Sequence, residues 1–64
     1  MMLTGGPKLL IEKLARAPNG FASSTDGSRI ARKAYEKVQA EDPEQAEAFF
    51  VELVMLGFHP ELTE

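Results

Sequence analysis

The chain contains no cysteine among its 64 residues. This absence excludes disulfide bonds, thiolate metal sites and thiol nucleophiles. A small domain without disulfides is more typical of the cytoplasm than of an oxidising compartment, and we therefore expect a cytoplasmic protein.

Long apolar runs are also missing. The N-terminal stretch MMLTGGPKLLIEK has no basic segment followed by a long apolar run, because Gly5, Gly6 and Pro7 interrupt it. We therefore expect neither a signal peptide nor a membrane-spanning helix, and no role at a membrane.

Basic residues are absent from the C-terminal part of the chain. Residues 41–64 hold seven acidic residues and no lysine or arginine, whereas residues 1–40 hold all seven basic residues and three acidic ones. The formal net charge of −3 therefore divides into +4 and −7 along the chain. This asymmetry predicts two surfaces of opposite charge.

A chain of 64 residues is close to the lower limit for a domain held together by one hydrophobic core. At this size, folding buries only ~60% of the surface of the unfolded chain, and the net stability is on the order of 3–5 kcal/mol. We expect one domain, and association with a second chain would add apolar burial to so small a core.

Helix start and stop signals divide the chain into three helical segments, and no segment alternates with the period of a β-strand. Pro7 suits a first helical position, and Pro18-Asn19-Gly20 ends the segment that precedes it. Thr25, Asp26 or Ser28 could cap the second helix. We predict an all-α domain with a flexible arm (1–6), helices over 7–17, 28–40 and 43–56, and a C-terminal tail (57–64).

The third helix has the clearest signals at both ends. Asp42, Pro43 and Gln45 resemble a capping box, in which the glutamine side chain returns to the residue that caps the helix. At the other end, Gly57 can adopt a left-handed conformation, and Phe58 can fold back onto Leu53.

The three helices differ in how many faces are apolar. The helices over 7–17 and 28–40 each have one apolar side, which in the second is formed by Ile30, Ala31, Ala34, Tyr35 and Val38. The helix over 43–56 has a broad apolar face (Ala46, Phe49, Phe50, Leu53, Val54, Leu56) and a second stripe opposite it (Ala48, Val51, Met55). Such a helix is covered on two sides, and we expect it to be central. Either the first two helices cover both faces, or the second stripe contacts another chain.

Residues that could carry chemistry are few. His59 is the sole histidine and has no neighbours that suggest a catalytic triad, so we interpret it as a surface residue. Glu44, Glu47 and Glu52 lack the Glu-x-x-His spacing of a carboxylate metal site and are interpreted as a solvated acidic face. Gly5-Gly6 does not belong to a phosphate-binding loop, since no strand leads into it and no Gly-x-x-x-x-Gly-Lys pattern follows. We therefore expect no enzyme, metal, cofactor or small-molecule substrate.

Four cations lie on one side of the helix over 28–40: Arg29, Arg32, Lys33 and Lys37. Together with the short turn that follows, they resemble the outline of a helix-turn-helix unit, but the helix that would enter the DNA groove begins with acidic residues. Three interpretations remain: a solvated face partly neutralised by acids of the third helix, a contact with an acidic protein, or a nucleic-acid contact.

The sequence thus predicts a small regulatory or adaptor protein that acts by protein–protein interaction through its apolar C-terminal helix. The predicted contact residues are Ala48, Val51, Met55 and Phe58. The partner is either another protein or a second copy, as in a homodimer. The alternative is a helix-turn-helix-like regulator that binds nucleic acid through the basic residues, and a structural subunit of a larger assembly ranks third.

Overall fold

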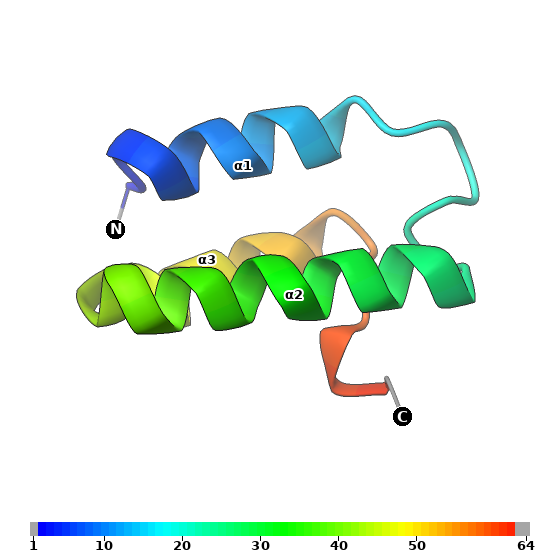
Figure 1. Ribbon diagram of the computed structural model, residues 1–64. Coiled ribbons are helices and arrows are strands. Elements are labelled where there is room, and N and C mark those ends of the chain that lie inside the picture. Colours follow the sequence, from blue (N-terminus) through cyan, green and yellow to red (C-terminus); the bar gives the residue numbers. More distant parts are fainter. Residues whose placement is uncertain (1, 63–64) are drawn as a thin grey trace.

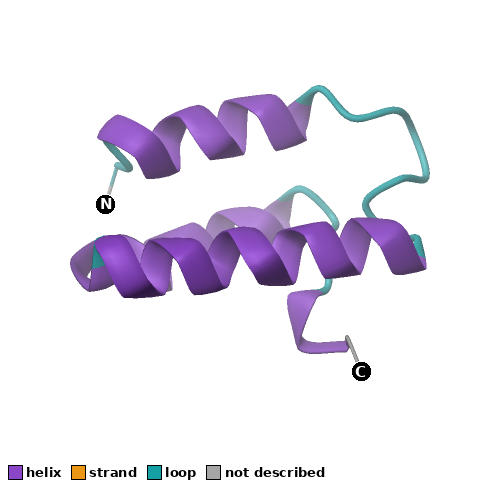
Figure 2. Cartoon of the chain, in the orientation of Figure 1, coloured by secondary structure: helices purple, strands orange, loops and turns teal. Residues whose placement is uncertain are grey.

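The computed structural model describes residues 2–62, which fold into three α-helices that alternate in direction along the chain (Figure 1). They are α1 (Gly5–Ala15), α2 (Thr25–Glu41) and α3 (Ala46–Met55), with the 3-10 segments η1 (Pro43–Gln45) and η2 (Pro60–Leu62). Within the described range there is no β-strand (Figure 2). The prediction of an all-α, three-helix domain is confirmed.

α3 is the central helix, because it contacts both α1 and α2. A long loop joins α1 to α2 (Figure 2), whereas α2 runs almost directly into η1 and α3. The buried apolar core consists mainly of residues from α2, α3 and the turn that follows α3: Ala31, Val38, Ala46, Phe49, Leu53 and Phe58. Side chains of α1, among them Leu10, Ile11 and Leu14, pack against this core while remaining partly exposed.

α2 begins earlier than predicted, and its cap is none of the three expected residues. The hydroxyl oxygen of Ser24 accepts a hydrogen bond from the Gly27 amide at 2.9 Å, and the same hydroxyl donates to the Phe21 carbonyl at 2.6 Å. The loop carbonyl lies so close to the helix that a Cβ atom at Gly27 would be 2.0 Å from the Phe21 oxygen. Gly27, which precedes the predicted helix over 28–40, is therefore a helical residue, and its lack of a side chain lets the preceding loop pack closely against α2.

The junction of α2 and α3 also differs from the prediction. The Gln45 side chain does not form a capping box; its amide nitrogen donates to the Asp42 carboxylate at 2.6 Å, and its oxygen accepts from the Thr4 amide at 2.8 Å. The predicted arm over residues 1–6 is therefore wrong in part: Gly5 and Gly6 are helical, and Thr4 is tied to η1, while Met1 lies outside the described residues.

The end of α3 follows the prediction. Gly57 has a φ of +97°, the Gly57 amide donates to the Val54 carbonyl, and the Phe58 amide donates to the Leu53 carbonyl, both at 2.9 Å. These are the two hydrogen bonds of a Schellman cap. The predicted C-terminal tail is wrong in part, because Phe58 and Pro60 are buried and η2 packs against α2; Thr63 and Glu64 lie outside the described residues.

The exposed apolar side chains show which helix faces have no cover. Leu9 is 61% exposed on the flank of α1, as its position in the sequence indicates. Ile30 and Val54, which we expected on covered faces, are 44% and 43% exposed. None of the helices in residues 2–62 combines the length and the apolar character needed to cross a membrane.

Candidate functional site

The side of α3 that points away from the core is apolar and exposed. We call Ala48, Val51, Val54 and Met55 the α3 outer face. Val51 is 50% exposed and Met55 is 75% exposed, while Ala48 is partly buried. Residues three and four apart on a helix are neighbours, so Val51 lies beside both Val54 and Met55 on the helix surface. Neither α1 nor α2 covers this surface, although both contact α3.

Three of the four predicted contact residues lie together on this surface, and the fourth does not. Phe58 is 1% exposed, and its ring packs edge-on against Phe21 with the centroids 6.4 Å apart. The Schellman cap reverses the chain direction after Gly57 and turns Phe58 into the core. The prediction of Phe58 as a partner contact is therefore corrected: it is a core residue in this structure.

Carboxylates border the α3 outer face. A shallow depression of about 400 Å³ is lined by Ala48 and Val51 at its apolar part and by Glu44, Glu47 and Glu52 around it. Among residues 2–62, none of these three glutamates takes part in an ion pair. The depression therefore combines an apolar floor with a negative rim.

The basic side chains of α2 form a separate surface. Arg29, Arg32, Lys33 and Lys37 are all exposed. Arg32 pairs with Glu36, one turn along the same helix, at 3.1 Å. Such an exposed pair within one helix contributes little to stability. In the described part of the chain, Arg29, Lys33 and Lys37 form no ion pair with an acidic residue of α3.

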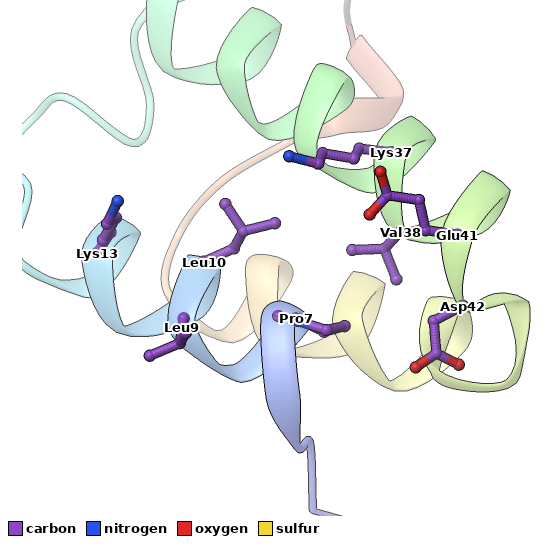
Figure 3. Close-up of a pocket in the computed structure, with 9 residues that line it drawn as sticks. Pro7, Leu9, Leu10, Lys13, Lys37, Val38, Glu41 and Asp42 are labelled. Atoms are coloured by element: carbon purple, nitrogen blue, oxygen red, sulfur yellow. The ribbon is translucent and has the colours of Figure 1, made fainter.

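A second depression, which the sequence did not indicate, lies between α1 and α2 (Figure 3). Its volume is about 220 Å³, and its apolar lining includes Leu9, Leu10 and Val38. Figure 3 shows Leu10 of α1 and Val38 of α2 on the two sides of this space, with Lys13, Lys37 and Glu41 at its rim. It arises because α1 packs mainly on α3, a feature that depends on tertiary packing and leaves no motif in the sequence.

His59 is the remaining residue that the sequence singled out for possible chemistry. It is partly buried, and its Nδ1 atom lies 3.5 Å from a carboxylate oxygen of Glu61. The described residues contain no group of three or more potential metal ligands. The buried residues include no titratable side chain in the described range.

Comparisons with protein-family models, with curated protein sequences and with solved structures found no match to this chain. Its function is therefore argued from its own surfaces.

Proposed function

We propose that this chain is a small, non-enzymatic regulatory or adaptor protein that binds another protein through the α3 outer face. The observation that carries the proposal is the exposure of Val51 and Met55, at 50% and 75%, on neighbouring positions of the central helix. Covering the exposed parts of these two side chains would contribute roughly 1–2 kcal/mol each. That gain is large beside the few kcal/mol expected of so small a core.

The shape of the surface also suits a protein partner. Val51, Val54 and Met55 are contiguous on the helix, so one partner helix can contact all three. Methionine adapts to partners of different shape because its side chain is unbranched and flexible. The large exposed apolar side chains on α1 and α2, by contrast, are Leu9 and Ile30, one on each helix.

The proposal is tested by comparing two double variants for association in an extract of the source cells. V51Q/M55Q removes the exposed apolar groups from α3, and L9Q/I30Q removes a matched pair from α1 and α2. We expect V51Q/M55Q to remain folded by circular dichroism and to lose a partner that the wild type and L9Q/I30Q retain. Equal retention by all three proteins would refute the proposal.

A second candidate is nucleic-acid binding through the basic residues of α2. It is supported by the exposure of Arg29, Lys33 and Lys37, none of which has an ion-pair partner among residues 2–62. Against it, Glu44 and Glu47 open the helix that follows α2, and carboxylates at that position repel a phosphate backbone. Protein binding through α3 therefore ranks first.

A further inference from the structure

The partner that fits the α3 outer face is defined by the charges around its apolar groups. Ala48 and Val51 lie in the same depression as the carboxylates of Glu44, Glu47 and Glu52. A partner that covers Val51 therefore also removes water from these carboxylates. Burying a carboxylate without a counter-ion is costly, so the partner must supply positive charge.

Within residues 2–62 of one copy of the chain, ion pairs do not supply this charge, although Lys8 of α1 lines a depression together with Glu52. Residues 41–64 contain no lysine or arginine, and in the described range the three glutamates form no ion pair with α1 or α2. The negative rim is thus available to a partner. In this respect the rim differs from Glu36, whose carboxylate already pairs with Arg32.

A second copy bound through the same surface does not meet the requirement. In a two-fold arrangement centred on Val51, residues at equal distances on either side are placed opposite one another. Glu47 of each copy would then face Met55 of the other, four residues away on the opposite side of the centre. Each contact would bury a carboxylate against a thioether, and neither α3 helix carries a cation to compensate.

We propose that the α3 outer face binds a cationic amphipathic helix of another protein. This inference rests on the proposed function and specifies the partner's chemistry. The aliphatic part of a lysine or arginine lies on Ala48 and Val51, and its charged group lies among Glu44, Glu47 and Glu52. An apolar residue one turn further along the partner contacts Val54 and Met55, because four residues of either helix span about 6 Å.

Two synthetic peptides of about 18 residues, long enough to form an isolated helix, provide the probe. Both carry the same leucines at positions i, i+3 and i+4; one has lysine and arginine at the flanking positions and the other has glutamate. The full chain is labelled with 15N, and amide chemical shifts are followed as each peptide is added. We expect the cationic peptide to shift the resonances of residues 44–55 and the acidic peptide to leave them unchanged.

Matched variants separate specific docking from general attraction to an acidic protein. E44Q/E47Q/E52Q removes the rim, whereas E36Q/E41Q/E61Q changes the net charge equally at exposed positions on α2 and η2. Since each exposed ion pair contributes modestly, we expect the first variant to weaken binding of the cationic peptide roughly tenfold and the second to weaken it much less. V51Q/M55Q should also weaken it, because it removes the apolar contacts.

The outcomes distinguish this inference from the proposed function. Equal binding of both peptides at residues 44–55 would overturn the cationic preference while supporting α3 as a docking surface. Equal weakening by both glutamine triple variants would show general electrostatic attraction and overturn the inference, as would the absence of shifts at residues 44–55. A native partner lost by V51Q/M55Q in any of these cases would leave the proposed function standing with a partner of different chemistry.

Discussion

Gly27 is a position where the fold depends on the absence of a Cβ atom. A Cβ atom there would lie 2.0 Å from the carbonyl oxygen of Phe21 and 2.9 Å from its carbonyl carbon. Both are backbone atoms, so a change of side-chain rotamer cannot relieve the contact. An ordinary van der Waals separation requires the loop to move by roughly 1 Å or more. We therefore expect Gly27→Ala to be strongly destabilising.

The loss of stability can be estimated from the interactions that Phe21 would lose if its carbonyl were displaced. The Phe21 oxygen accepts hydrogen bonds from the Ser24 amide at 3.0 Å and from the Ser24 hydroxyl at 2.6 Å, and the Phe21 ring packs against Phe58. Overpacking of a tight site typically costs ~1–3 kcal/mol. With a urea m-value of ~1 kcal/mol/M for a small domain, the unfolding midpoint should fall by about 1–3 M.

Gly6→Ala is the matched control. Gly6 lies in the first turn of α1, and a Cβ atom there meets nothing within 4 Å. Because alanine restricts the unfolded chain more than glycine does, this substitution should stabilise the protein by about 0.4–1 kcal/mol. Both variants are compared with the wild type by urea unfolding at 222 nm. A Gly27→Ala protein as stable as the wild type would refute the close approach of the loop to α2.

The remaining predictions concern the core and the basic surface. Phe58→Ala should lower the free energy of unfolding by ~3–5 kcal/mol, because the side chain is 1% exposed, and should largely unfold the domain in thermal denaturation. Met55→Ala, at 75% exposure, should change the free energy of unfolding by less than about 1 kcal/mol. A stable, soluble Phe58→Ala protein that has lost partner binding would restore Phe58 as a contact residue. The wild type should not retard duplex or single-stranded nucleic acid at near-physiological ionic strength, and salt-sensitive binding in the micromolar range, abolished by R32E/K33E, would instead support the nucleic-acid candidate.

Most of the fold could be predicted from the sequence because helix signals are local. Pro43 and Gly57 mark the two ends of the third helical segment through backbone properties that act within a few residues. The cap of α2 could not be identified in this way. Ser24 accepts from the Gly27 amide three residues along the chain, but several neighbouring polar side chains could have capped the helix, and the approach of the Phe21 carbonyl to Gly27 has no sequence motif. Gln45 likewise bonds to Thr4, which is 41 residues away in the chain.

The candidate site could be predicted in part for the same reason. Ala48, Val51 and Met55 share one side of a helix because their spacing is three and four residues, which is a property of the sequence. The sequence could not decide whether another helix of the same chain covers that side. The burial of Phe58 depends on the direction of the chain after Gly57. The exposure of Val54 depends on where α2 and η2 pack.

The central position of α3 and the exposure of its outer face are consistent with one another. α3 is short, with ten residues, and its buried residues Ala46, Phe49 and Leu53 lie on one side. α1 and α2 both pack toward that side, so their contacts with α3 do not extend around the helix. A helix from a partner would occupy the open side and enclose α3 completely. The two apolar stripes of this helix therefore differ: one forms the core of the chain, and the other is the surface for which we propose a partner with charge complementary to Glu44, Glu47 and Glu52.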